Sequence, residues 1–187
     1  MMKTIFRTSA IALLLPLAAQ AAEYSLVDVK QSAINFSYQQ MGVGMDGKFN
    51  EFTSTLHFDP AKPAEGKAVL DVALASIDAG TEEANGEVAG KDWFNTSAFP
   101  TAHFESGAIK ALGDNRFEVN GKLTIKGKTI DVLVPATFKE ENKQGVFAGS
   151  FTIRRGDFAI GEGSWSTFDS VANDIQIKFT ITATSSN

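Results

Sequence analysis

The side chains most often used for metal binding and nucleophilic catalysis are scarce in this chain. It has two histidines, His57 and His103, and no cysteine. Neither histidine has carboxylates at metal-ligand spacing, and the sequence has no G-x-S-x-G nucleophile motif. Both histidines are flanked by apolar residues in alternating segments, so we expect them to point outward. We therefore expect no metal site, and a binding protein is favoured over an enzyme.

A few polar residues remain that could act on a bound molecule. Tyr38, Gln40 and Asp157 could serve as the polar groups of an enzyme. Arg154 and Arg155 are consecutive, and strand geometry places consecutive side chains on opposite faces. We expect one arginine to be solvated and the other to point toward the end of the sheet. The inward arginine would pair with Asp157 or another loop carboxylate, or bind an anionic head group bidentately.

The elements that would position these groups are indicated by aromatic residues at every second position. The chain has 15 Phe against 2 Trp and 2 Tyr. Ile34, Phe36 and Tyr38 alternate with polar residues, and Phe147, Phe151 and neighbouring positions repeat the pattern. This is the period of a β-strand with one apolar face. Such a face either fills a core or lines an apolar cavity.

Strand follows strand along most of the chain, with short polar turns between them. The alternation predicts strands over 32–40, 43–52, 54–59, 67–77, 101–111, 115–125, 128–140, 145–154 and 171–184. Short connections between successive strands require antiparallel neighbours. The predicted fold class is therefore all-β, and one-sided antiparallel strands form either a sandwich or a closed barrel.

Two stretches interrupt the strands. The first, 78–100, is long for a hairpin loop, and Glu82 to Val88 could form a short helix. It ends in Trp93 and Phe94, which would either cover a cavity as a lid or plug the bottom of a barrel. The second, 156–169, is rich in glycine and reads as either a mobile flap or a plain loop.

The first residues have the composition of a secretory leader. Lys3 and Arg7 precede an apolar run over 10–19, and Ala19 to Ala21 fit a signal-peptidase site. We expect residues 1–21 to be a signal peptide and residues 22–187 to form one exported domain. The net charge of −5 makes nucleic acid an unfavourable partner.

Four groups of residues, in this order, resemble the YceI-like family. They are Ser32 to Phe36 with Gly47 to Phe49; Asp92 to Phe94 with Phe99, Pro100 and Phe104; Gly121 to Gly127; and Arg155 to Phe158. The similarity runs from about Tyr24 to Ala183. For residues 22–187 it implies a periplasmic β-barrel domain, an antiparallel eight-stranded, lipocalin-like barrel with a long loop or short helix at one end. It also implies an apolar cavity for a long-chain lipid, such as a polyisoprenoid or an isoprenoid quinone.

The resemblance also implies which residues line that cavity. Gln40 stands where members often have a histidine, and the segment before the aromatic pair lacks their basic residues. The expected ligand-binding residues are Ile34, Phe36, Tyr38, Gln40, Phe49, Phe58, Trp93, Phe94, Phe104, Leu123 and Phe158.

Two kinds of partner follow from the resemblance as well. Some members are homodimers. The run from Gly161 to Trp165 resembles a branch associated with cytochrome b561-type membrane proteins, which favours a neutral quinone as ligand. The leading interpretation is an exported carrier or sequestering protein for a long isoprenoid chain, without a cofactor. The alternatives are a lipid- or quinone-modifying enzyme and a packed interaction module for a membrane cytochrome.

Overall fold

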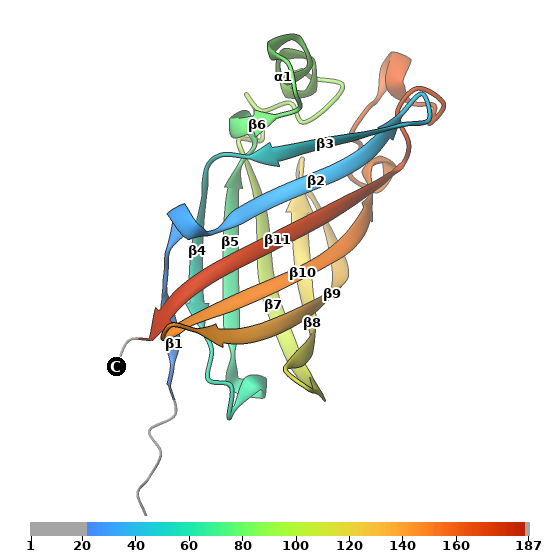
Figure 1. The fold of residues 1–187 in the computed structure, drawn as a ribbon. Helices are drawn as coiled ribbons and strands as arrows, with labels where there is room; N and C mark the ends of the chain where they lie inside the picture. The colour runs from blue at the N-terminus through green and yellow to red at the C-terminus, as the bar shows by residue number, and fades with distance from the viewer. Residues whose placement is uncertain (1–21, 186–187) are drawn as a thin grey trace, which may run out of the picture.

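A computed structural model describes residues 22–185, and its strands form one antiparallel sheet that curls into a half-barrel (Figure 1). The predicted signal peptide, residues 1–21, lies outside the described residues. The strands are β1 Tyr24–Val27, β2 Ala33–Gln40, β3 Val43–Phe49, β4 Phe52–His57, β5 Lys67–Ala73, β6 Ile77–Asp78, β7 Thr101–Gly113, β8 Arg116–Ile125, β9 Lys128–Glu141, β10 Gln144–Arg154 and β11 Asp174–Ser185. Their order in the sheet is β4-β5-β7-β8-β9-β10-β11-β2-β3-β6, and β1 pairs with β11.

The predicted all-β antiparallel class is confirmed, whereas the number of strands differs from the eight expected. Eleven strands occur in the described part of the chain. The two short ones, β1 with four residues and β6 with two, give too little alternation to be seen in the sequence. β1 has a structural role, because the backbones of Tyr24 and Phe58 exchange hydrogen bonds of 2.9 and 3.1 Å. β1 thereby links β11 to the chain just after β4.

The predicted inner and outer faces are confirmed where the alternation is regular. In β8, Phe117, Leu123 and Ile125 are buried, whereas Arg116 and Lys122 are exposed. Two glycines on this inner side make room for aromatic rings. A Cβ on Gly47 would lie 2.2 Å from the ring of Phe36, its partner across β2 and β3. A Cβ on Gly121 would lie 2.3 Å from the ring of Phe104.

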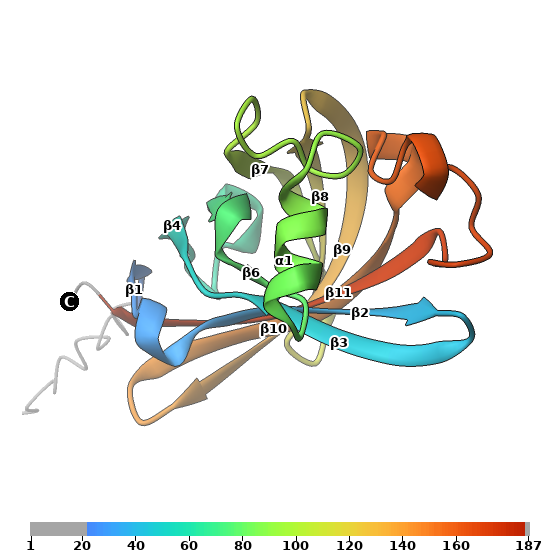
Figure 2. The ribbon, with the colours of Figure 1, turned by 90° about the horizontal axis from the view of Figure 1, so that it is seen from above.

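The expected short helix is present as α1, Glu82–Ala89. It begins at Thr81, whose Oγ1 accepts a hydrogen bond of 3.1 Å from the backbone N–H of Ala84. Figure 2 shows α1 lying over one end of the curled sheet, with the 155–173 connection beside it. We call this the mouth end, and the opposite end, where β1 lies, the floor end.

The second irregular stretch is neither a simple loop nor free of structure. It contains two 3-10 turns, η4 Arg155–Phe158 and η5 Gly163–Trp165. The other 3-10 turns are η1 Val29–Gln31, η2 Pro63–Glu65 and η3 Leu74–Ser76. Among the residues that the structure describes, no helix has the length and apolar character needed to cross a membrane.

Candidate ligand-binding cavity

A cavity of about 650 Å³ lies inside the curled sheet and reaches from the mouth end to the floor end. Its volume is within the roughly 300–1,000 Å³ of typical small-molecule sites. Gln40 and Glu87 line it at the mouth, and Phe58 and Phe117 line it at the floor. Every strand from β2 to β11 contributes lining residues, and most of them are aliphatic or aromatic. The cavity is therefore a long apolar space with polar groups gathered at one end.

The structure brings ten of the eleven predicted ligand-binding residues to this cavity. The lining includes Ile34, Phe36, Tyr38, Gln40, Phe49, Phe58, Trp93, Phe94, Phe104 and Leu123. Phe158 is not among the lining residues. Its ring is 2% exposed and packs in the main hydrophobic core, because η4 turns the chain there away from the strand direction. The roles of all eleven as ligand contacts stay predictions.

Aromatic rings form a continuous wall on β2 and β3. The ring centroids of Phe36 and Tyr38 are 6.0 Å apart, and those of Phe36 and Phe49 are 5.5 Å apart. Phe49 in turn meets Phe94 at 6.3 Å, edge to face. These separations are typical of favourable aromatic contacts. The wall thus links the sheet to the segment after α1, which places Trp93 and Phe94 against the cavity near the mouth.

The floor is closed by a second group of rings. Phe58 contacts Phe117 at 5.3 Å and Phe147 at 5.1 Å, both edge to face. Tyr24, on β1, packs against Phe138 at 5.2 Å and donates its hydroxyl to Glu140 Oε2 at 2.8 Å. Burial, together with this carboxylate, raises the pKa of Tyr24 to about 12.

At the mouth, the expected partners of the inward arginine are corrected by the structure. Arg154 is exposed and Arg155 is 1% exposed, as strand geometry requires. None of the carboxylates in the described part of the chain, Asp157 included, pairs with Arg155. Each of its three guanidinium nitrogens instead donates to backbone carbonyl oxygens, at 2.8–3.2 Å. These belong to Ala172, Ile160, Gly161, Trp165, Thr167 and Val171.

Two aromatic rings also lie against the guanidinium group of Arg155. Its Cζ lies 5.3 Å from the ring centroid of Trp93 and 4.8 Å from that of Phe168. Gly161 permits the close approach, because its φ is +78° and a Cβ there would lie 2.0 Å from Nη1. Burial lowers the pKa of Arg155, but an arginine stays charged in proteins. Arg155 therefore organises the 155–172 connection around one buried cation.

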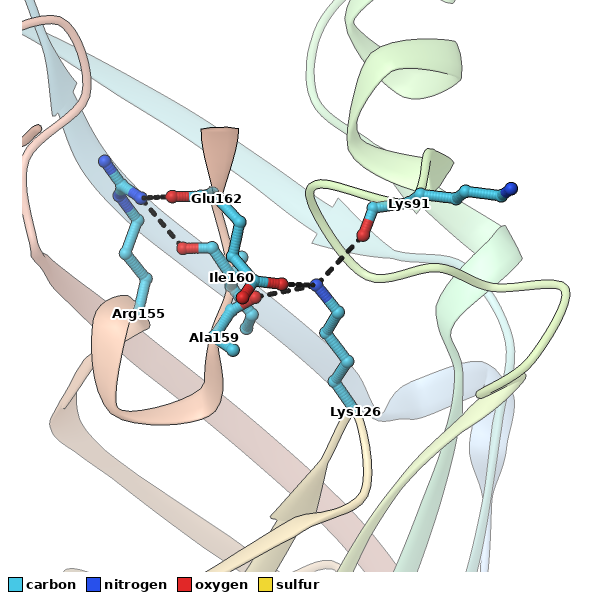
Figure 3. Close-up of polar contacts among 7 residues, drawn as sticks. Lys91, Lys126, Arg155, Ala159, Ile160 and Glu162 are labelled. Carbon is cyan, nitrogen blue, oxygen red and sulfur yellow. Dashed lines mark hydrogen bonds and ion pairs between the residues drawn. The ribbon is translucent and has the colours of Figure 1, made fainter. Parts of the chain in front are cut away.

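A second cation joins that connection to the segment after α1. Lys126 Nζ donates to the backbone oxygens of Lys91 and Ala159 at 3.0 and 2.7 Å, and it pairs with Glu162 Oε2 at 2.8 Å (Figure 3). Its side chain is 8% exposed. The hydrogen bond and charge of Lys126 lower the pKa of Glu162. The carbonyl of Asp92 accepts the N–H groups of residues 161 and 162 at 2.8 and 2.7 Å.

One side-chain contact crosses from α1 to η5. Trp165 Nε1 donates to Glu87 Oε1 at 2.7 Å, and both residues line the cavity. The ring of Trp165 also lies 5.4 Å from that of Trp93. The mouth is thus bordered by two segments that touch through an indole and a carboxylate.

The groups considered for catalysis are not assembled. Tyr38 and Gln40 line the cavity, but Asp157 is exposed and does not. His57 faces Glu23 at 3.1 Å and His103 faces Asp71 at 2.7 Å, both on the outer surface of the sheet. The described residues include no group of three or more side chains suited to hold a metal ion.

Both the sequence and the fold of this chain are similar to those of known proteins. The sequence-family model that describes the YceI-like domain matches residues 26–183. The chain belongs to the YceI-like domain family. It is 32% identical, over 76% of its length and 78% of the relative's, to a UPF0312 protein of Azotobacter vinelandii. The crystal structure of Burkholderia cenocepacia BcnA superposes with a TM-score of 0.82 at 42% identity, over 84% of this chain and 99% of BcnA.

A further solved structure shares this YceI-like fold at lower identity. A polyisoprenoid-binding domain from Saccharophagus degradans superposes with a TM-score of 0.66 at 16% identity, over 88% of this chain and 99% of that domain. At this identity the similarity shows the fold alone.

Several residues of the YceI-like cavity were not predicted from the sequence. Phe117 and Phe147 lie on the same inner faces as predicted residues, so the alternation alone would have found them. Glu83 and Glu87 are one helical turn apart on α1, a spacing that places both on one helix face. Nothing in the sequence showed that this face would meet the cavity.

Proposed function

We propose that this YceI-like protein holds one long isoprenoid chain in its cavity and carries or sequesters it in the periplasm. The observation that supports this most directly is the cavity itself, which is lined mainly by apolar side chains and has its charged lining residues, Glu83, Glu87 and Arg155, at the mouth. A polyisoprenoid has the same division into a long apolar chain and one polar end. The Saccharophagus degradans domain, described as polyisoprenoid-binding, provides an analogy through its fold.

The energetics of burial favour such a ligand. Transfer of apolar surface from water contributes roughly 25 cal/mol per Å², so several hundred Å² correspond to on the order of 10 kcal/mol before ordering costs. The wall is built from rings and branched aliphatic side chains, which contact a methyl-branched chain closely. A packed interaction module would need an interior without a continuous cavity, and the structure offers no support for that alternative.

The proposal is tested by identifying what the protein holds. Protein purified from its own periplasm would be extracted with organic solvent, and the extract analysed by mass spectrometry. We expect an isoprenoid lipid in near-stoichiometric amount. Its absence from several independent preparations would contradict the proposed function.

A cavity-filling variant supplies the matched comparison. Ala136 lines the cavity on β9, and its neighbour Thr137 is exposed. Ala136→Trp should fill part of the cavity and reduce the bound lipid several-fold, whereas Thr137→Trp should not change it. Circular dichroism of both variants would show that they are folded. Equal lipid in the two would place the ligand elsewhere.

The remaining parts of the proposal concern location and partners. The prediction of export rests on Lys3, Arg7 and the Ala19–Ala21 site, and N-terminal sequencing that finds the mature protein starting at Ala22 would support it.

A non-enzymatic role is proposed because Asp157 lies outside the cavity. Bound lipid that is chemically converted over time would contradict it. Association with a cytochrome b561-type protein, and homodimer formation, would be tested by cross-linking in membranes and by light scattering.

A further inference from the structure

The indole N–H of Trp93 is a hydrogen-bond donor without a partner. Trp93 is 7% exposed and lines the cavity near the mouth. Its Nε1 is buried and has no hydrogen-bond partner among the residues that the structure describes. A buried donor left unpaired costs about 1–3 kcal/mol, and native proteins keep few of them. An oxygen atom of a bound ligand would satisfy it.

Two cations near the mouth, Arg155 and Lys126, are already engaged by the protein. Arg155 is the only arginine or lysine among the lining residues, and all three of its guanidinium nitrogens donate to backbone carbonyls. Lys126 is bound by three oxygen atoms, and Figure 3 shows the ammonium of Lys91 turned away from it. Neither lysine lines the cavity. No lining side chain of the described part therefore offers a free positive charge to a ligand.

Two carboxylates line the same end. Glu83 and Glu87 are four residues apart on α1, and both belong to the cavity lining. Glu87 accepts the indole N–H of Trp165 and so is held at the mouth. A phosphate or carboxylate head group would meet two like charges there. Because both glutamates are exposed, their repulsion would be partly screened by salt, with a Debye length of about 8 Å at physiological ionic strength.

We propose that the mouth selects an uncharged head group that carries an acceptor oxygen, which binds the indole N–H of Trp93, and that Glu83 and Glu87 disfavour anionic head groups. This inference rests on the proposed function and specifies its ligand class: isoprenoid alcohols, ethers or quinone-like carbonyl compounds rather than isoprenoid phosphates. The oxygen acceptor and the absence of negative charge are separable properties, so each has its own test.

The charge is tested with geranylgeraniol and geranylgeranyl diphosphate, which differ only in the head group. Delipidated protein would be loaded with the neutral dye Nile red, and each lipid would be titrated below its micelle-forming concentration. We expect the diphosphate to displace the dye at least about tenfold more weakly, a factor equal to about 1.4 kcal/mol. The difference should shrink as salt is raised.

Charge variants assign that difference to the two glutamates. Glu83→Lys combined with Glu87→Lys should improve binding of the diphosphate relative to the alcohol by about tenfold or more. Glu82→Lys is the matched control, because Glu82 lies in the same helical turn but does not line the cavity. It should change the ratio much less.

The acceptor oxygen is tested with Trp93→Phe, which keeps an aromatic ring and removes the N–H. Binding of geranylgeraniol should weaken by roughly 2- to 10-fold, the range for one neutral hydrogen bond. Binding of phytane, a hydrocarbon with the same branched skeleton and no oxygen, should not weaken. Equal losses for both would show that Trp93 contributes packing only and would overturn the acceptor assignment.

The outcomes separate this inference from the proposed function. If the diphosphate bound as tightly as the alcohol to the wild-type protein, the head-group inference would be wrong while isoprenoid binding stood. If none of the three lipids displaced the dye, the proposed function would be contradicted as well.

Discussion

The two ends of the half-barrel are closed by different kinds of interaction. At the floor, Phe58, Phe117 and Phe147 meet edge to face, with Tyr24 behind them. At the mouth, charged side chains bind backbone carbonyls, with Arg155 and Lys126 as the centres. The floor is therefore held by many contacts of similar size. The mouth depends on a few contacts, each of which joins segments that are distant in the sequence.

This difference suits a cavity that must be both closed and accessible. Among the residues that the structure describes, the floor has no buried side-chain donor or acceptor without a partner, and its rings extend the apolar wall of the cavity. At the mouth, backbone that leaves the sheet must have its carbonyl oxygens satisfied. Arg155 does this for six residues of one connection. Connections fixed in this way hold Trp93 and Trp165 beside the opening, where both pack against the main hydrophobic core.

The largest expected effect comes from removing the cation at the mouth. Arg155→Met would leave buried carbonyl oxygens without donors, and we expect the free energy of unfolding to fall by about 3–5 kcal/mol. Urea denaturation would measure it. Arg154→Met is the matched control, because Arg154 is exposed and adjacent, and its effect should stay within about 0.5 kcal/mol. Similar losses in the two variants would mean that the mouth does not depend on Arg155.

The second prediction concerns the floor and alkaline pH. The pKa of Tyr24 is raised from its ordinary value of 10.0 to about 12, first by burial and then by Glu140. Between these two values the unfolded chain loses the tyrosine proton while the folded protein keeps it. Stability is therefore fully present below about pH 10 and falls as pH rises toward 12, by at most about 2–3 kcal/mol.

Comparison with Tyr24→Phe isolates this contribution. The variant cannot ionise at that position, so the wild-type advantage in unfolding free energy should decrease as pH rises from about 8 to 11. Tyr38, whose pKa burial also raises, is present in both proteins and cancels. An advantage that is constant across this range would contradict the assigned cause.

The floor and the walls were largely predictable from the sequence, because they follow the two-residue period of single strands. Phe36, Phe104 and Leu123 could be placed on inner faces without knowing which strands were neighbours. The short edge strands were not predictable, since two to four residues carry no period. Phe158 was assigned to the cavity by the family resemblance alone, and the turn η4, which carries its ring into the core, gave no signal in the strand pattern.

The mouth was much less predictable, since its contacts are set by tertiary structure. The sequence showed that one of two adjacent arginines turns inward, but carboxylates were the expected partners. Backbone carbonyls have no sequence signature, so the partners of Arg155 and Lys126 could not be inferred. The one available signal was Gly161, whose lack of a Cβ allows the guanidinium to approach.

The smallest expected effect on stability is at the contact between α1 and η5. Trp165→Phe removes the hydrogen bond to Glu87 but keeps a ring beside Trp93. The bond is exposed, so we expect a loss below about 1 kcal/mol in unfolding free energy. Geranylgeraniol should nevertheless dissociate a few-fold faster, because this bond joins the two segments that border the mouth. Stopped-flow dye displacement would measure the rate, and a double-mutant cycle with Glu87→Ala would show whether the two side chains act together. An unchanged dissociation rate would mean that the ligand does not leave between α1 and η5, and that the mouth, like the floor, is static.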